Sequence, residues 1–156
     1  MTPNQNAQKY FKRYQKLKEA VKYLTELIEE TKATILYLES VETVLNQAGL
    51  DEIAEIREEL IQTGFIRRRQ REKIQKRKKP EKYLASDGKT IILVGRNNLQ
   101  NEELTFKIAR KEELWFHAKD IPGSHVVISG NLNPSDEVKT DAAELAAYYS
   151  KGRLSN

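Results

Sequence analysis

One stretch determines how the first part of the chain folds: residues 10–45 read YFKRYQKLKEAVKYLTELIEETKATILYLESVETVL. Apolar side chains recur there at alternating spacings of four and three residues, which is the heptad pattern of a coiled coil. Neither proline nor glycine occurs between Ala7 and Ala48, so the stretch predicts one helix of about 40 residues, about 60 Å long. The heptad seam, whose apolar pattern only Thr31 and Glu42 break, consists of Tyr14, Leu17, Val21, Leu24, Ile28, Thr31, Ile35, Leu38, Glu42 and Leu45.

A second helix is expected to turn back on the first. Gly49 fits a C-terminal cap and Asp51 an N-terminal cap. The prediction is therefore a long antiparallel helical coiled coil, whose second arm is shortened by Gly64. Part of the first helix then has three possible environments: it packs against another domain, it packs against a second copy, or it remains solvated. Packing against a second copy would be self-association through the coiled coil. The apolar positions of the second arm are Ile53, Ile56, Leu60 and Ile61.

The character of the sequence changes at Pro80. Residues 90–94 form a short β-branched run bounded by glycines, which is typical of a buried strand. The sequence predicts an α+β fold in two parts: residues 1–79, a helical hairpin with a basic end, and residues 80–156, a small mixed α/β domain with a mixed sheet. The other predicted elements are a helix at residues 102–110, strands at residues 114–118 and 125–129, and a last helix carrying Val138, Ala142, Leu145 and Tyr149.

The net charge of +4 hides blocks of opposite sign. Residues 26–62 carry a net charge of −8, and residues 67–82 carry +8, from ten basic side chains in sixteen positions. A run this basic favours nucleic acid as a partner. The alternative is a solvated helix that pairs with the acidic residues 26–62. The basic residues assigned to RNA binding are Arg67, Arg68, Arg69, Arg71 and Lys73.

Several function classes are excluded or disfavoured by the residues themselves. Without cysteine, the chain has no disulfide, no thiol nucleophile and no iron–sulfur cluster. Residues 1–14 lack the apolar stretch of a secretory signal, and no apolar run has the length of a membrane span. We therefore expect a soluble cytoplasmic protein. Neither a GxGxxG motif nor a phosphate-binding loop occurs, which disfavours nucleotide hydrolysis.

The two histidines do not suggest a metal or a catalytic site. His117 and His125 are eight residues apart, which is not the spacing of a one-turn helical metal pair. Ser124 and Asp120 could form a hydrolase triad with a histidine, but no GxSxG motif surrounds the serine, which disfavours hydrolysis. We expect no enzymatic activity, no cofactor and no metal.

The same region suits RNA better. Trp115 and His117 are two residues apart in a predicted strand, so their side chains lie on one face and can stack on unpaired bases. Arg96, Lys107 and Lys119 would supply positive charge near the phosphates. The alternative is that one of Trp115 and Phe116 packs into the core while its neighbour points outward.

Three strings of residues closely resemble the RNA-binding domain of the NFACT family: VGRNNLQN at 94–101, LTFK at 104–107 and LWFHAKDIPGSHVVI at 114–128. The string NAQKYFKRYQKLK at residues 6–18 resembles the start of that family's long coiled coil. The family includes a bacterial ribosome quality-control factor and streptococcal proteins first called fibronectin-binding proteins. The resemblance covers essentially the whole sequence.

The resemblance implies a factor that binds a stalled large ribosomal subunit, recruits tRNA and supports the addition of C-terminal alanine tails. Arg96 and Lys119 would touch phosphate, and Gly123 would let the backbone approach RNA closely. The positions that match the family motif are Arg96, Asn97, Asn98, Trp115, His117, Lys119, Gly123, Ser124 and His125.

Two departures from the family pattern shape these expectations. Nothing in the sequence corresponds to the family's large N-terminal region, which is needed for tailing, so this chain alone is not expected to elongate anything. The family's RNA-binding domain also continues beyond the helix that ends near Tyr149, so the domain is expected to be truncated at its C-terminus and the sheet incomplete.

Two other functions remain open. One is a fibronectin-binding surface adhesin, which would place the protein at the cell surface as well as in the cytoplasm. The other is a coiled-coil dimerisation module without a ligand.

Overall fold

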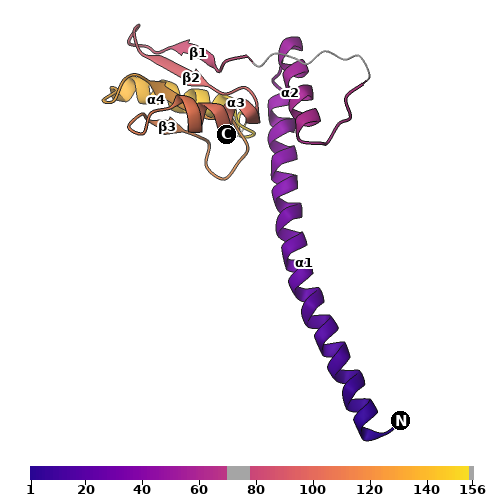
Figure 1. Cartoon of the computed structure of the whole chain (residues 1–156). Helices are drawn as coiled ribbons and strands as arrows, with labels where there is room; N and C mark the ends of the chain where they lie inside the picture. Colours follow the sequence, from indigo (N-terminus) through magenta and orange to yellow (C-terminus); the bar gives the residue numbers. More distant parts are fainter. Residues whose placement is uncertain (70–77, 155–156) are drawn as a thin grey trace. The chain divides into compact units, whose positions relative to one another are not determined.

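The computed structural model describes residues 1–69 and 78–154. It divides into two compact units, Met1–Leu38 and Glu39–Asn156. The first unit consists of the N-terminal part of helix α1 (Pro3–Leu45), which has 43 residues (Figure 1). The prediction of one long helix is confirmed.

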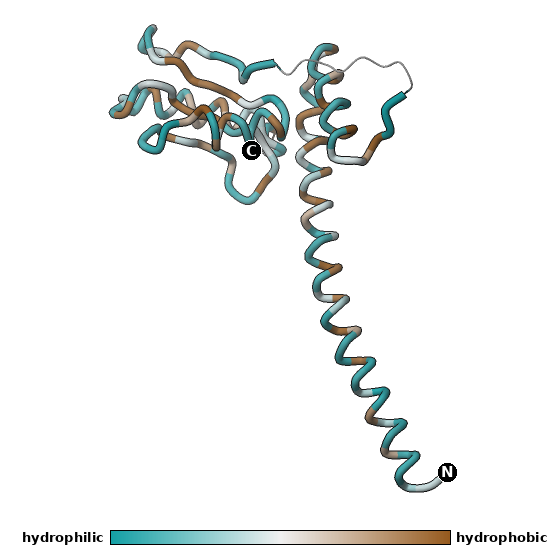
Figure 2. The backbone as a smooth tube through the Cα atoms, viewed as in Figure 1, coloured by the Kyte–Doolittle hydropathy of each residue, from teal (hydrophilic) through white to brown (hydrophobic). Residues whose placement is uncertain are grey.

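The heptad seam of the first unit is exposed. Tyr14 exposes 59% of its surface and Val21 65%, and Figure 2 shows apolar positions recurring among polar ones along α1. The prediction that this seam packs against another domain or a second copy stays a prediction. Among the residues that the structure describes, no helix has the length and apolar character needed to cross a bilayer.

The second unit contains the end of α1 and a shorter helix, α2 (Leu50–Gln62). The arms are unequal as expected, because α2 has 13 residues. The prediction of Asp51 as the N-cap is wrong: Gly49 is the N-cap, and its amide donates a hydrogen bond to Glu52 Oε2 at 2.7 Å. Asp51 lies in the first turn, where its charge still favours the helix dipole.

Four strands form one sheet in the order β1-β2-β4-β3, and every described pair is antiparallel. The expected α+β class is confirmed, whereas the expected mixed sheet is wholly antiparallel in the described part of the chain. A tight turn joins the first two strands: Gly88 has φ 67°, and the Asp87 carboxylate accepts the Thr90 amide at 2.8 Å. The strands are β1 (Glu81–Leu84), β2 (Ile91–Val94), β3 (Trp115–Phe116) and β4 (Val126–Ser129).

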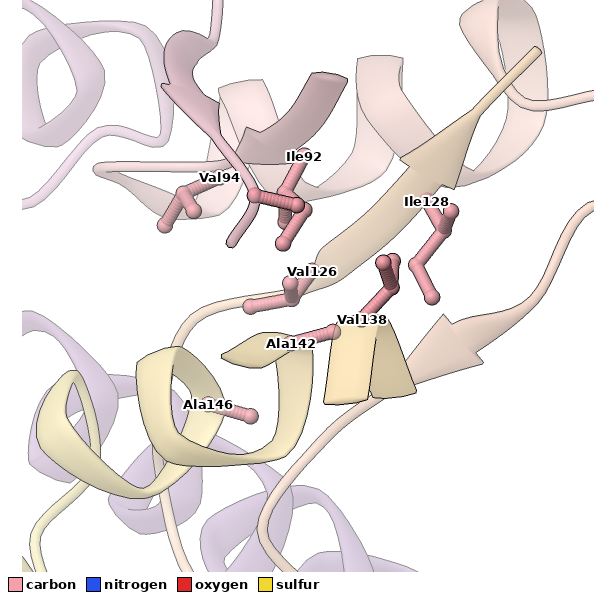
Figure 3. Packing of buried hydrophobic residues seen from close by; sticks show 8 residues of the cluster. Ile92, Val94, Val126, Ile128, Val138, Ala142 and Ala146 are labelled. Atoms are coloured by element: carbon pink, nitrogen blue, oxygen red, sulfur yellow. The ribbon is translucent and has the colours of Figure 1, made fainter. Parts of the chain in front are cut away.

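The two faces of the sheet are covered differently. Helix α4 (Asp136–Tyr148) packs Val138, Ala142 and Ala146 against one face, as Figure 3 shows. The other face carries α3 (Asn98–Glu103) and a π-helical turn, η1 (Leu104–Ile108), whose Leu104 is fully buried. The helix predicted at residues 102–110 therefore starts four residues earlier and ends as a π-turn. Such turns often occur at functional sites.

Candidate nucleic-acid interface

Three ring side chains meet where β3 pairs with β4. The Trp115 and His117 rings are stacked, with centroids 5.6 Å apart and 12° between their planes. The His125 ring lies 5.1 Å from Trp115 and 5.2 Å from His117, nearly perpendicular to both. We call these three residues the aromatic cluster. The prediction that Trp115 and His117 share a face is confirmed.

His125 is held in place by three neighbouring segments. Its amide donates to Asn101 Oδ1 at 2.9 Å, and its carbonyl accepts the Gly95 amide at 3.0 Å. Its Nδ1 lies 2.7 Å from the Thr105 hydroxyl on η1. Gly95 is required here, because a Cβ at that position would lie 2.2 Å from Asn101 Oδ1. The cluster is therefore built on a closely packed backbone.

The environment of the aromatic cluster keeps the imidazole of His125 uncharged. Burial, together with the charge of neighbouring His117, lowers the pKa of His125 from 6.5 to about 4, so its imidazole is neutral near pH 7. Trp115 remains 48% exposed. A partly exposed indole backed by imidazole rings can stack on an unpaired base, as aromatic side chains do in single-strand-binding proteins.

Two exposed lysines lie on segments next to the aromatic cluster. Lys107 lies on η1, the turn whose Thr105 contacts His125, and Lys119 follows His117 by two positions. Both lysines are exposed, and neither has an ion-pair partner within the described residues. Phe106, beside Lys107, is 78% exposed. The arrangement places positive charge and ring faces on neighbouring segments.

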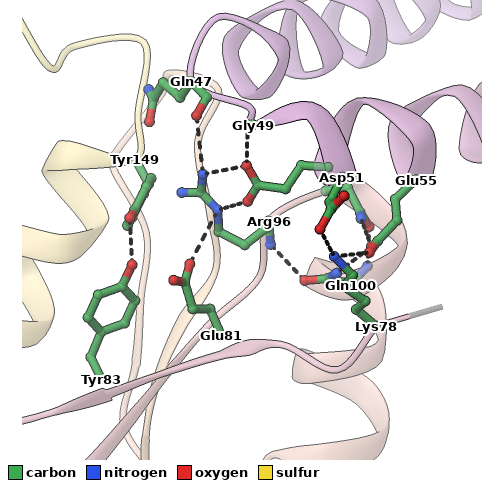
Figure 4. Close-up of polar contacts among 12 residues, drawn as sticks. Gln47, Gly49, Asp51, Glu55, Lys78, Glu81, Tyr83, Arg96, Gln100 and Tyr149 are labelled. Atoms are coloured by element: carbon green, nitrogen blue, oxygen red, sulfur yellow. Dashed lines mark hydrogen bonds and ion pairs between the residues drawn. The ribbon is translucent and has the colours of Figure 1, made fainter.

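Arg96 was expected to touch phosphate, but the structure turns its guanidinium inward (Figure 4). The side chain is only 9% exposed, its Nε donates to Glu52 Oε1 at 2.7 Å, and the guanidinium lies 3.9 Å from the Tyr149 ring centre. Burial alone would raise the pKa of Glu52, but the hydrogen bond and charge of Arg96 outweigh it and hold that pKa below its usual range. Arg96 is therefore a positioning residue that ties α2 to the sheet.

Asn97 and Asn98 also have partners inside the second unit. Asn97 caps α3 by accepting the Gln100 amide at 2.8 Å, and its Nδ2 donates to Glu55 at 3.3 Å. Asn98 donates to the carboxylate of Glu59 through its backbone amide at 3.1 Å and its side chain at 2.9 Å. Both residues were predicted to bind RNA. In the structure they donate hydrogen bonds to carboxylates of α2 instead.

Gly123 and Ser124 make close contacts within the chain rather than offering a surface. A Cβ on Gly123 would lie 3.0 Å from the Ser150 Cβ, and the Ser124 amide donates to the Tyr149 carbonyl at 2.9 Å. Ser124 is 2% exposed. The close approach predicted for Gly123 is therefore an approach to the end of α4 and not to a ligand.

Only part of the basic run lies within the described residues. Arg67 and Arg69 are exposed, while Arg68 pairs with Glu58. Lys78 pairs with acidic residues of α2, at 3.2 Å from Asp51 and 3.9 Å from Glu55. The alternative of pairing with the acidic residues 26–62 is therefore observed for Arg68 and Lys78. Arg71 and Lys73 lie outside the described residues.

Comparison with protein-family models identifies the family. The model of the NFACT N-terminal and middle domains matches residues 1–79, and the model of the NFACT protein RNA binding domain matches residues 79–153. This chain belongs to the NFACT family. The aromatic cluster, Lys107 and Lys119 all fall within the segment that matches the NFACT RNA binding domain.

Curated NFACT relatives match over the full length of the chain. The Rqc2 homolog RqcH of Streptococcus pneumoniae serotype 2 is 92% identical over 156 residues, and that of Bacillus subtilis is 43% identical over 160 residues. The chain spans 28% of the length of each. A solved structure, the C-terminal of the fibronectin/fibrinogen-binding protein from Streptococcus suis, is 78% identical with a TM-score of 0.95, covering 100% of this chain and 63% of that chain.

The sequence analysis did not predict that the glutamates on one face of α2 bind polar side chains near the sheet. Glu52, Glu55 and Glu59 hold Arg96, Gln100 and Asn98 respectively. Their spacings of three and four place them on one helix face, which was a readable signal. In the described part of the chain, no group of three histidines, aspartates or glutamates is arranged to hold a metal ion.

Proposed function

We propose that this chain is an RNA- and ribosome-binding part of a ribosome-associated quality-control factor. In this proposal it binds the large ribosomal subunit and tRNA, and it helps the complete protein to add C-terminal alanine tails to stalled nascent chains. The observation that carries the proposal is the aromatic cluster, accompanied by the exposed Lys107 and Lys119, within an NFACT RNA binding domain. The names of the RqcH relatives support it.

The proposed mechanism is binding without catalysis. An unpaired base stacks on the exposed indole of Trp115, while Lys107 and Lys119 neutralise nearby phosphates. Looped or single-stranded RNA suits this geometry, because a regular A-form helix keeps its base faces stacked internally. A factor with this role works in the cytoplasm, where ribosomes are found.

The test is binding of the chain to purified large ribosomal subunits and to tRNA across a salt series. Phosphate contacts release counterions, so the logarithm of the binding constant should fall linearly with the logarithm of salt concentration. The site variant is Lys107→Gln combined with Lys119→Gln, which should lower the slope, and its charge-matched control is Lys9→Gln combined with Lys89→Gln, which removes two exposed charges outside the site. Absence of binding to both RNA ligands at low salt would refute the proposal.

A second candidate function, fibronectin binding, is favoured by the description of the S. suis relative as a fibronectin/fibrinogen-binding protein. Immobilised fibronectin serves as the parallel target in the same salt series. A protein–protein interface of mixed polarity should depend on salt less steeply than phosphate binding does. Fibronectin binding without RNA binding would put this function first and add the cell surface as a location.

A further inference from the structure

The aromatic cluster occupies only one end of a sheet face. Residues directly opposite each other in neighbouring strands point to the same face. Lys82 lies opposite Leu93, Leu93 opposite Val127, and Val127 opposite Trp115. One row of side chains therefore crosses the face away from α4, from Lys82 on β1 to Trp115 on β3. With strands about 4.8 Å apart, the row is about 14 Å long.

The π-turn η1 crosses the middle of this row and divides the face in two. Its Leu104 packs on Leu93 and Val127. On the β3 side, Thr105 contacts His125 of the aromatic cluster. On the β1 side, Ile108 and the neighbouring Glu103 line a groove of about 480 Å³ between η1 and the first two strands.

The groove combines an apolar floor with a charged rim. Ile91, Leu93 and Ile108 form the floor. Lys79 and Lys82 lie on the rim; both are exposed and have no ion-pair partner among residues 1–69 and 78–154. Lys78 differs, because it pairs with Asp51. Two ammonium groups are therefore left for an anion beside an apolar surface.

The volume and the charge fit one nucleotide. Small-ligand sites span about 300–1,000 Å³, and an apolar floor suits the faces of a base while rim lysines suit its phosphate. The one acidic rim residue, Glu103, repels phosphate but can accept a hydrogen bond from an exocyclic amino group, as carboxylates do from cytosine N4.

We propose that this groove holds one unstacked, amino-bearing nucleotide of the RNA strand that also contacts the aromatic cluster. Lys79 and Lys82 bind its phosphate, and Glu103 selects a base with an amino group. This inference rests on the proposed function and deepens it, because it defines a second nucleotide position on the same sheet face with η1 between the two.

The first experiment measures binding of fluorescent octacytidylate to the full chain. Lys79→Gln with Lys82→Gln should lower the log–log salt slope by about 0.7, since the two lysines bind one phosphate and each neutralised phosphate on single strands contributes about that much. The charge-matched control, Lys9→Gln with Lys89→Gln, should keep the wild-type slope. Ser129→Phe, which fills the groove without changing charge, should weaken binding about five-fold or more, with circular dichroism confirming the fold.

The second experiment compares octacytidylate with octauridylate, whose bases lack the amino group. One additional hydrogen bond predicts about two- to ten-fold tighter binding of octacytidylate. Glu103→Ala should bring this ratio close to one, while Glu102→Ala, an exposed neighbour outside the groove lining, should leave it unchanged. A ratio unaffected by Glu103→Ala would refute the base selection.

The groove and the proposed function fail in distinguishable ways. If the wild-type chain binds RNA and Trp115→Ala weakens that binding, but Ser129→Phe and the Lys79/Lys82 variant bind like wild type, the groove proposal is wrong and the RNA function stands. If the wild-type chain binds neither octamer nor ribosomal subunits, the proposed function itself fails.

Discussion

The indole of Trp115 is 48% exposed and is backed by two imidazoles, so it can stack on a base without first leaving the core. Trp115→Ala should therefore weaken binding to looped or single-stranded RNA by about 5- to 100-fold, the range that base–aromatic stacking supplies. Duplex binding should change far less. Titrations of one hairpin with an unpaired loop and one blunt duplex measure the difference. Equal losses on both RNAs, with an unchanged melting temperature, would argue against stacking.

His125 makes the stability of the second unit depend on pH. Its pKa is about 4 in the folded chain and near 6.5 in the unfolded chain, so below pH 6.5 the unfolded state binds the extra proton. Above pH 6.5 the contribution of His125 to the melting temperature should be constant. As the pH drops from 6.5 to 4, the melting temperature should fall. Calorimetry across this range should show a shallower fall for His125→Gln than for the wild-type chain. Parallel curves for wild type and His125→Gln would contradict the prediction.

The roles of single residues followed from sequence only where their partners were near in the chain. The common face of Trp115 and His117 follows from strand geometry alone. The inward position of Arg96 does not follow from the sequence, because its partner Glu52 is 44 residues away. The residues around an arginine do not show whether it forms an ion pair with a distant residue. Long-range ion pairs carry no local signal.

At the scale of elements, α2 is joined to α3 through the buried carboxylate of Glu59. Glu59 is 1% exposed and accepts two hydrogen bonds from Asn98. Glu59→Ala leaves two half-buried donors of Asn98 without their acceptor and should lower the free energy of unfolding by about 2–4 kcal/mol. Glu59→Gln, which retains one acceptor oxygen, should lose less.

Urea denaturation of these variants measures the effect. The control is Glu19→Ala at an exposed position of α1, which should change stability by less than about 0.5 kcal/mol. If Glu59→Ala unfolded at the same urea concentration as Glu19→Ala, the carboxylate face of α2 would not be the joint that the hydrogen bonds suggest.

Elements with strong periodicity were predictable, and those defined by packing were not. The 43-residue helix follows from its heptads, which only Thr31 and Glu42 break, and β2 follows from its β-branched run. The strand β1 was missed because EKYL has no apolar alternation and exposes three of its four residues. The π-turn was read as ordinary helix, since the fully buried Leu104 that anchors it on the sheet is a tertiary feature.

For the whole molecule, the distribution of charge determines how RNA binding depends on salt. Replacing Arg67, Arg68, Arg69 and Arg71 together with serine should weaken binding to all RNAs alike, because phosphate contacts carry no sequence information. The triple variant that keeps Arg68 isolates the contribution of this one arginine, since Arg68 pairs with Glu58. The triple variant should lower the log–log salt slope by about two on single strands.

The additional loss of Arg68 should lower the slope by less than the roughly 0.7 of a full phosphate contact on single strands, because its charge is already neutralised in part by Glu58. Filter binding of tRNA and of one octamer at five salt concentrations gives the slopes. The uniform loss distinguishes this basic segment from Trp115, whose loss depends on RNA structure. If the triple variant lost affinity for tRNA only, the arginines would be reading shape at one site, and general phosphate attraction would no longer explain their clustering.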